Sequence, residues 1–191
     1  MKYYFRLLWL LLTRSRRPPC PVLGPCVSTF RVWPNDLDVF MHMNNGAYLT
    51  IADLGRIDLL IRSDAYEPIR ARGWYPVIAG ESIRFRRSLT LGERYTITSR
   101  ILGWNERSLY IEQVFERGAR KGSDGPGGER DRLVARALID ARFLARGGAR
   151  VGTAEIADAI GFDPRSPELP RWVLDWRESM REMELARDRE P

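Results

Sequence analysis

The sequence predicts an α+β fold in which one long helix packs against a strongly curved antiparallel sheet. Two observations support it. Apolar residues recur at helical spacing over one stretch in the first third of the chain, and four later stretches are rich in alternating β-branched and aromatic residues. The chain has 191 residues, of which 44% are hydrophobic and 29% charged. This length fits one domain with short appendages, and this composition excludes a disordered chain.

The long helix is predicted to begin at Asn44 or Asn45 and to end near Arg62. Both asparagines are good N-cap residues, and the positions that follow are apolar around most of the helix circumference. We therefore expect other elements to wrap this helix. A strand is expected just before it, over residues 27–33, followed by an irregular polar connection over residues 34–43.

The four β-rich stretches cover residues 75–89, 93–102, 108–117 and 133–144. Because three turns join them in sequence, we expect an antiparallel meander. Residues 118–128 contain five glycines and a proline and are expected to form a mobile hairpin loop. Helices over residues 154–160 and 171–185 should cover part of the sheet. The predicted parts are an N-terminal segment and linker (1–25), a central domain (26–147) and a helical tail (148–191).

The positive charge is concentrated at the start of the chain. Residues 1–17 hold five basic side chains and no acidic one, so that only +1 of the formal charge of +6 remains for residues 18–191. A nearly neutral body lacks the basic face that nucleic-acid binding requires. We therefore expect no nucleic-acid partner.

The apolar run over residues 3–12 has two interpretations. With Arg6 in its middle it is about half the length that a bilayer span needs, and its charge order departs from that of a signal peptide. It is either a short helix that docks on the body or a weak peripheral contact with a membrane surface through residues 1–17. The stripe expected to dock consists of Tyr4, Leu7, Leu8, Leu11 and Leu12.

Cysteine and histidine counts limit the chemistry. The only histidine is His42, and the only cysteines are Cys20 and Cys26, which argues against a zinc site and metal-dependent hydrolysis. The two cysteines are interpreted as unpaired thiols in a reducing cytoplasm, with a small disulfide loop as the alternative. We expect a cytoplasmic protein that is peripheral at a membrane if residues 1–17 make the membrane contact.

One segment gathers groups that can act on an acyl carbonyl. Asp36, Asp38 and His42 lie just before the predicted helix start. The unpaired N–H groups of a helix start can hold a carbonyl oxygen that becomes anionic, and a nearby carboxylate can attack the carbonyl or activate water. The alternative is that these residues only cap the helix and form a turn.

Short motifs flank the predicted helix: Asp36-Leu-Asp38, His42-Met-Asn-Asn45, Tyr48-Leu49 and Gly80-Glu-Ser-Ile-Arg-Phe-Arg-Arg87. They resemble the hot-dog thioesterases of the 4-hydroxybenzoyl-CoA thioesterase type, in particular the bacterial acyl-CoA thioesterase branch and its animal relative, thioesterase superfamily member 6. The resemblance covers roughly residues 30–144. It implies a hot-dog fold, a homodimer or tetramer joined at sheet edges, and active sites at the subunit interface.

The resemblance also implies site residues. Asp38 takes the position of the catalytic nucleophile or base, and His42 the position of a catalytic His in plant acyl carrier protein thioesterases. The implied substrate-binding residues are Asn44, Asn45, Gly46, Ala47 and Tyr48, at the helix start, and Arg84 and Arg86, on a strand. Backbone N–H groups near residues 46–48 would polarise the thioester. The two arginines would meet the phosphates of coenzyme A, and solvated edge charges are the alternative.

Three further positions bear on activity. Phe40 and Met41 stand where relatives often have Asn and a Gly or Gln, which removes a polar partner and adds bulk beside His42. Asp53 could face the pocket or cap a neighbouring loop.

The function implied by the resemblance is hydrolysis of a fatty or aromatic acyl thioester of coenzyme A or acyl carrier protein. The products are the free acid and the thiol. No cofactor is expected, because coenzyme A enters only as part of the substrate. The alternatives are a catalytically weak acyl-binding protein on the same fold and a membrane-surface adaptor.

Overall fold

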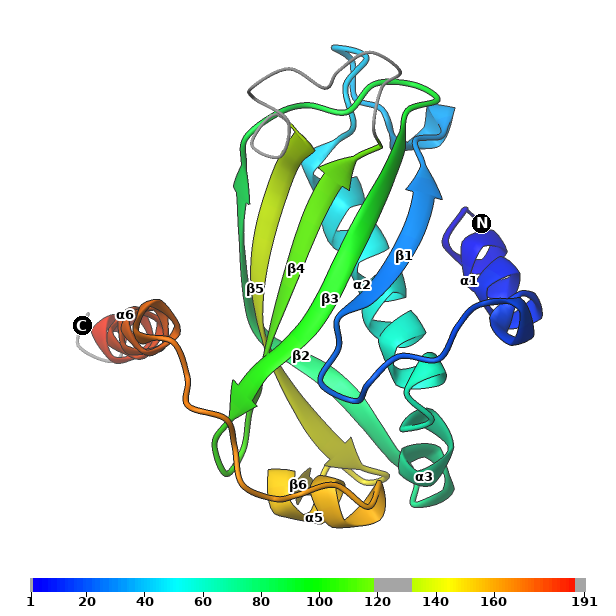
Figure 1. The fold of residues 1–191 in the computed structure, drawn as a ribbon. Helices are drawn as coiled ribbons and strands as arrows, with labels where there is room; N and C mark the ends of the chain where they lie inside the picture. Colours follow the sequence, from blue (N-terminus) through cyan, green and yellow to red (C-terminus); the bar gives the residue numbers. More distant parts are fainter. Residues whose placement is uncertain (1, 119–131, 188–191) are drawn as a thin grey trace. The chain divides into compact units, whose positions relative to one another are not determined.

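The computed structural model describes residues 2–118 and 132–187. The loop expected over residues 118–128 therefore lies outside the described residues from residue 119 on. Within the described part, six strands form one sheet (Figure 1). They are β1 Cys26–Arg31, β2 Trp74–Phe85, β3 Arg94–Trp104, β4 Leu109–Arg117, β5 Leu133–Ala145 and β6 Arg150–Val151.

The strand order corrects one expectation. The order is β1-β3-β4-β5-β2, with β6 paired to β5, so β2 lies beside β5 and the expected four-strand meander is wrong. The cause lies in the connection after β2. The N–H groups of Arg86 and Arg87 both donate to the carbonyl of Val134 on β5, at 2.7 and 3.1 Å, whereas the Glu93 carbonyl accepts from Val32 after β1. Residues 86–93 thus cross from β5 to β1 instead of making a tight hairpin.

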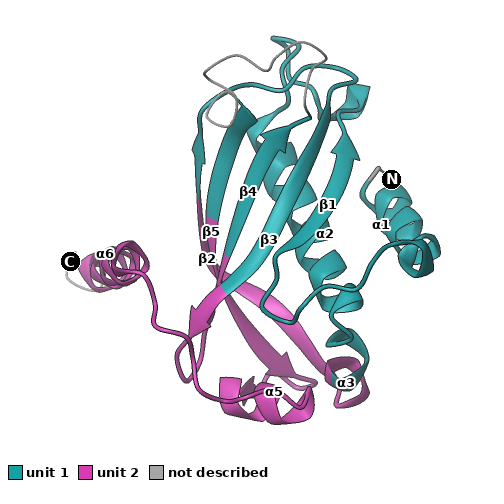
Figure 2. Cartoon of the chain, in the orientation of Figure 1, with its two compact units in different colours: residues 1–68, 83–101, 112–137 teal, residues 69–82, 102–111, 138–191 magenta. Residues whose placement is uncertain are grey.

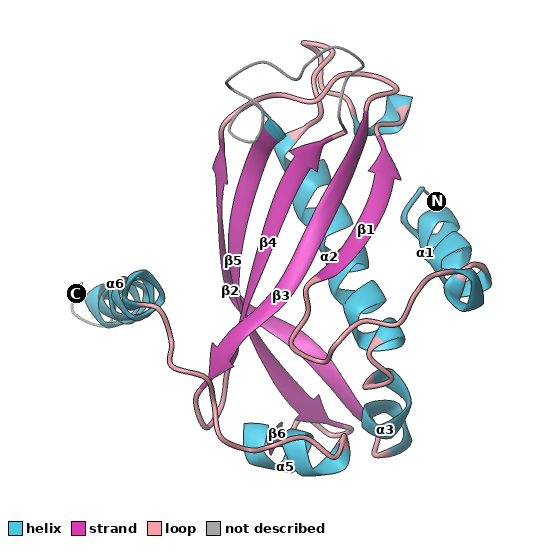
Figure 3. Cartoon of the chain, in the orientation of Figure 1, coloured by secondary structure: helices cyan, strands magenta, loops and turns pink. Residues whose placement is uncertain are grey.

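The helices follow the predicted positions closely (Figure 3). They are α1 Lys2–Leu12, α2 Asn45–Arg62, α3 Tyr66–Ala71, α5 Thr153–Ala159 and α6 Arg171–Arg187, with 3-10 turns η1 Arg14–Arg16 and η2 Pro34–Asp36. The prediction of the long helix is confirmed, with Asn44 as N-cap. The short α3 was not expected from the sequence.

The described chain divides into two compact units, and the long strands β2 to β5 each contribute to both (Figure 2). In the unit that holds residues 1–68, 83–101 and 112–137, apolar residues of α2 such as Tyr48, Ile51 and Leu54 form a core with Tyr95 and Phe115 of the strands. The predicted wrapping of the helix is confirmed. The domain boundaries expected from the sequence stay a prediction.

The other unit has its own small core. It consists of Tyr110, Leu138 and Val173, with Leu102, Leu169 and Trp176 packed against them. Since Val173 and Trp176 belong to α6, the tail covers part of the sheet, as expected.

The N-terminal helix docks, but through a different face from the one predicted. Tyr3, Arg6, Leu7 and Leu10 face the body, whereas four of the five residues expected to dock, all but Leu7, are exposed. The reason is that the charged Arg6 has a buried carboxylate to pair with, so it turns inward and sets the rotation of the helix. The docking interpretation is confirmed and its stripe is corrected.

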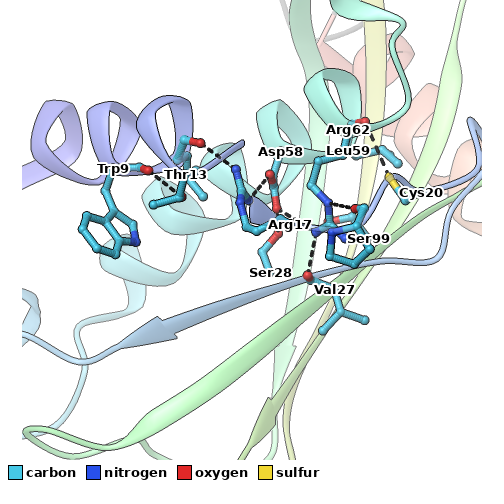
Figure 4. A network of polar contacts seen from close by, with 12 residues as sticks. Trp9, Thr13, Arg17, Cys20, Val27, Ser28, Asp58, Leu59, Arg62 and Ser99 are labelled. Atoms are coloured by element: carbon cyan, nitrogen blue, oxygen red, sulfur yellow. Dashed lines mark hydrogen bonds and ion pairs between the residues drawn. The ribbon is translucent and has the colours of Figure 1, made fainter. Parts of the chain in front are cut away.

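A second contact follows the helix. Arg17 pairs with the fully buried Asp58 of α2, whose other oxygen accepts from Ser28 at 2.6 Å and from Arg62 at 3.2 Å (Figure 4). Tyr3 donates to Asp53 at 2.5 Å. Residues 1–17 are thus held by the contacts of Arg17 with Asp58 and of Tyr3 with Asp53, both on α2. A third contact joins Arg6 to Asp36 in the loop before α2.

Cys20 and Cys26 are free thiols. Burial raises the pKa of the Cys26 thiol above its ordinary value, which makes it unreactive.

Candidate active site

Asp36 is the anchor of the loop that precedes α2. Its side chain is fully buried and accepts from the Trp33 N–H at 2.9 Å and from both terminal nitrogens of Arg6, at 3.1 and 2.6 Å. The Arg6 guanidinium also lies over the Trp33 ring, 4.3 Å from its centroid. Because this carboxylate is enclosed by its partners, it cannot reach a substrate, and the capping alternative holds for Asp36.

The backbone of Asp36 connects the anchor to the helix start. Its carbonyl accepts from the N–H of Asn44, the N-cap of α2, at 2.8 Å. The loop between them closes through a bridge from Leu37 to Met43. Asp36 therefore closes the loop of residues 37–43, because its backbone binds Asn44 at the far end of the loop. Its side chain is in turn bound by Arg6 of α1.

Asp38 lies inside this closed loop and is half-buried. One carboxylate oxygen, Oδ1, accepts from the N–H groups of Phe40 and His42, at 2.9 and 3.2 Å. The backbone completes the turn, since Asp38 N–H donates to the His42 carbonyl at 2.8 Å. Oδ2 has no hydrogen-bond donor within the described chain. A carboxylate that is oriented by two amides and has one oxygen open can take a proton from water.

His42 is exposed, and its backbone bridges to Thr90 on the crossing segment. Its N–H orients Asp38, but its ring makes no hydrogen bond to any residue that the structure describes. In this arrangement His42 contacts Asp38 through its backbone N–H and not through its imidazole. The ring is free to contact a substrate.

The amides at the start of α2, expected as oxyanion donors, make the hydrogen bonds of the helix cap. The Gly46 N–H donates to the Asn44 side chain at 2.8 Å, and the N–H groups of Ala47 and Tyr48 donate to the Asn44 carbonyl at 2.9 and 3.4 Å. The amides expected to polarise the thioester are thus already occupied by the cap. Among the helical amides in the described chain, that of Asn45 is left without an acceptor at this end, because it is the first of the helix.

The side chains of Ala47 and Tyr48 belong to the core. Tyr48 is 1% exposed, stacks edge-on with Phe85 and Phe115, and its hydroxyl accepts from the Leu89 N–H at 3.2 Å. The Tyr48 side chain thus packs in the core, and its expected contact with substrate stays a prediction. The sequence predicted a strand as far as Leu89, whereas β2 ends at Phe85. The segment that crosses the sheet was missed, because an apolar residue in a loop cannot be told from the end of a strand by sequence pattern.

Arg84 and Arg86 are both exposed. Arg86 lies just beyond the end of β2, and no hydrogen bond joins either residue to Asp38 or His42 in the described chain. Their two interpretations, coenzyme A contact or solvated charge, both remain compatible with this placement.

The tip of the loop is apolar and uncovered. Val39, Phe40 and Met41 are 89%, 75% and 60% exposed. Met41 adopts a left-handed backbone with φ of 63°, a conformation that glycine adopts at no steric cost. Its side chain is exposed and is not part of the core.

Asp53 is engaged by the N-terminal helix. It accepts from Tyr3 of α1 and from Arg56 at 3.3 Å, which helps to hold α1 on α2. No group of three or more His, Cys, Asp or Glu side chains that could hold a metal ion occurs in residues 2–118 and 132–187.

The family model of the thioesterase-like superfamily matches residues 32–177. The chain belongs to this superfamily. Among the curated members of the thioesterase-like superfamily, it is similar to Protein THEM6 of Danio rerio, with 38% identity over 114 residues, 59% of this chain and 56% of that protein. It is also similar to Long-chain acyl-CoA thioesterase FadM of Escherichia coli, with 35% identity over 79 residues, 41% of this chain and 60% of that protein.

The fold of this superfamily member is also seen in a solved structure. The probable thioesterase YbaW from Escherichia coli is 26% identical, with a TM-score of 0.59, and the match covers 70% of this chain and 95% of that one. This likeness confirms the hot-dog fold expected from the motifs. The chain spans about half the length of the curated relatives it matches.

Proposed function

We propose that this chain is a thioester hydrolase that converts a fatty or aromatic acyl thioester of coenzyme A or acyl carrier protein into the free acid and the thiol. The observation that carries the proposal is the Asp38 carboxylate, oriented by two amides in a loop that closes on the start of α2. The similarity to an acyl-CoA thioesterase supports coenzyme A as the carrier.

In the proposed reaction Asp38 acts as general base. Water attacks the thioester carbonyl carbon while its proton passes to the open oxygen of Asp38. The first amide of α2, at Asn45, donates to the oxygen that becomes anionic, aided by the partial positive charge of the helix start. The C–S bond then breaks, and the leaving thiolate takes the proton from Asp38. Neither a metal nor a redox cofactor is needed for these steps.

A hydrolysis screen over acyl-CoA chain lengths, with free thiol as the readout, tests the proposal. Turnover of at least one thioester, lost in Asp38→Asn, is the expected result. The exposed apolar loop tip at Phe40 and Met41 favours the second candidate, an acyl-binding protein without turnover. Saturable acyl-CoA binding with no thiol release at any chain length would establish that candidate and reject the first.

The exposed ring of His42 leads to a distinct expectation. We expect His42→Ala to raise KM while kcat falls by less than about tenfold, because proton transfer by a side chain contributes roughly 10²-fold or more and this ring has no bond to Asp38 in the described chain. Steady-state kinetics on one acyl-CoA substrate measure both values. A fall in kcat beyond about 10²-fold would instead give His42 a part in proton transfer.

The sheet edge predicts a homodimer. β2 is one of the two outermost strands of the order and is 12 residues long. It exposes Tyr75, Ile78 and Phe85 by 42%, 40% and 37%. A long apolar edge with unpaired backbone groups is stable in solution only when it is covered. We expect sedimentation equilibrium at micromolar protein to show a dimer or a multiple of it.

A charge on the edge should weaken this assembly. Ile78→Lys is expected to shift the equilibrium toward monomer, whereas Leu91→Lys, at a position 51% exposed in a turn, should leave it unchanged. A monomeric parent protein would contradict the proposed assembly.

Peripheral membrane contact is part of the proposal for residues 1–17. The outward face of α1 exposes large apolar side chains, with Tyr4 71%, Phe5 70% and Trp9 67% exposed. A helix whose apolar face is left uncovered beside arginines is suited to the lipid interface. None of the described helices is both long enough and apolar enough to span a bilayer.

A further inference from the structure

A groove lies between α1, the proline-rich linker and β1, entirely within one of the two compact units. Its volume is about 1080 Å³, slightly above the roughly 300–1,000 Å³ of ligand pockets. Phe5 and Trp9 of α1 line it together with Val27 and Trp33. None of the described residues that line it is Asp or Glu, whereas five are arginines. The groove is therefore apolar in its lining and positive in its charge.

Two of these arginines stand at one place. Arg31 on β1 and Arg94 on β3 are directly opposite each other in the antiparallel register, and both are exposed. Neither side chain has a carboxylate partner among the described residues, unlike Arg6, Arg17 and Arg62 in the same lining. Like charges directly opposite on a strand pair destabilise it, and an anion placed between them reverses that effect.

We infer that this groove binds an anionic membrane lipid, whose phosphate lies between Arg31 and Arg94 and whose acyl chain enters the apolar lining beside Phe5 and Trp9. The inference deepens the membrane contact proposed for residues 1–17 and gives that contact a headgroup charge. It is separate from the Asp38 site, because none of residues 37–48 lines the groove.

The exposed face of α1 selects a lipid surface over a free fatty acid. Phe5 and Trp9 line the groove yet remain 70% and 67% exposed, and Leu8 and Leu12 continue the same helical stripe at 51% and 70%. A single fatty acid in the groove would leave this stripe in water. A bilayer covers the stripe and supplies the anion at once.

Co-sedimentation of the full chain with vesicles tests the inference. The two vesicle types are phosphatidylcholine alone and phosphatidylcholine with phosphatidylglycerol. We expect Arg31→Gln/Arg94→Gln to lower partitioning onto the anionic vesicles by about 30-fold, about fivefold for each arginine, with little effect on neutral vesicles. Phe5→Ser/Trp9→Ser should lower partitioning onto both types.

The control is Arg171→Gln/Arg181→Gln, which removes two exposed arginines of α6 from the other unit. It should keep partitioning within about twofold of the parent. The proposed binding depends on Arg31 and Arg94 at the groove and not on the net charge of the protein. Equal losses in the two double variants, or binding of free palmitate without binding of vesicles, would overturn the inference. Thermal unfolding shows whether each variant is folded.

Hydrolysis of a short, water-soluble acyl-CoA separates this inference from the proposed function. The groove variants should keep the parent rate, since none of residues 37–48 lines the groove. A chain without turnover that still sediments with anionic vesicles would reject the hydrolase and retain the lipid site. Deletion of residues 1–17 is unsuited to this test, because it removes Arg6 and Arg17 from buried carboxylates.

Discussion

Replacing Asp38 by Asn is expected to lower kcat by about 10²-fold or more while the fold and acyl-CoA binding are retained. Asparagine keeps the Oδ1 acceptor that the amides of Phe40 and His42 require, so the turn is preserved. It loses the charge that takes a proton from water. Rates and KM on one acyl-CoA substrate, with a thermal unfolding curve, measure the effect.

Asp36→Asn is the matched control, two residues away. It should lower the free energy of unfolding by about 3–5 kcal/mol, because the buried Arg6 loses its counter-charge, and the rate per folded molecule should fall less than in Asp38→Asn. Unchanged activity of Asp38→Asn would sink the catalytic assignment and favour the acyl-binding candidate.

Replacing Arg6, the ion-pair partner of Asp36, should also have a large effect, in this case on the free energy of unfolding. Arg6→Met keeps much of the side-chain length of a residue that is 5% exposed, but leaves the Asp36 carboxylate buried without its cation. We expect a loss of about 3–5 kcal/mol in the free energy of unfolding, measured by urea denaturation.

Two comparison variants define the cause. Arg14→Met, two positions after α1 ends and exposed, should change stability by less than about 0.5 kcal/mol. Arg6→Met/Asp36→Leu should recover much of the loss, because an apolar pair replaces a buried ion pair without an orphaned charge. A loss in Arg6→Met no larger than in Arg14→Met would show that the ion pair is not what holds the loop.

Local patterns predicted the elements of this fold well. The asparagine caps and the apolar coverage of α2 gave both ends of the helix, and the β-branched stretches gave β1 to β5 within a few residues. The placement of β2 could not be predicted in this way. Its neighbour depends on where residues 86–93 lead the chain, and that path depends on contacts with Val134 and Val32, far away in sequence.

The site was predictable in its motif and not in its contacts. The spacing of Asp36 and Asp38 suggested two similar carboxylates, and the family resemblance selected Asp38. The fold adds the contacts that enclose Asp36 and leave one oxygen of Asp38 open. The enclosure of Asp36 depends on the buried side chain of Arg6. The apolar pattern of residues 3–12 gives no reason to expect that an arginine there is buried. The position of Arg6 on the same helix face as Tyr3, Leu7 and Leu10 is the one sequence feature that could have indicated its burial.

The region matched by the superfamily model begins at residue 32, yet two carboxylates inside that region depend on residues before it. Asp36 is neutralised by Arg6, and Asp58 by Arg17 together with Arg62; Arg6 and Arg17 both lie outside the homologous region. The part of the chain that supplies these buried ion pairs is therefore longer than the region that homology outlines. A chain trimmed at residue 32 would keep the motif and lose part of its internal charge balance, so trimming boundaries in such proteins are better drawn from buried ion pairs than from alignment ends.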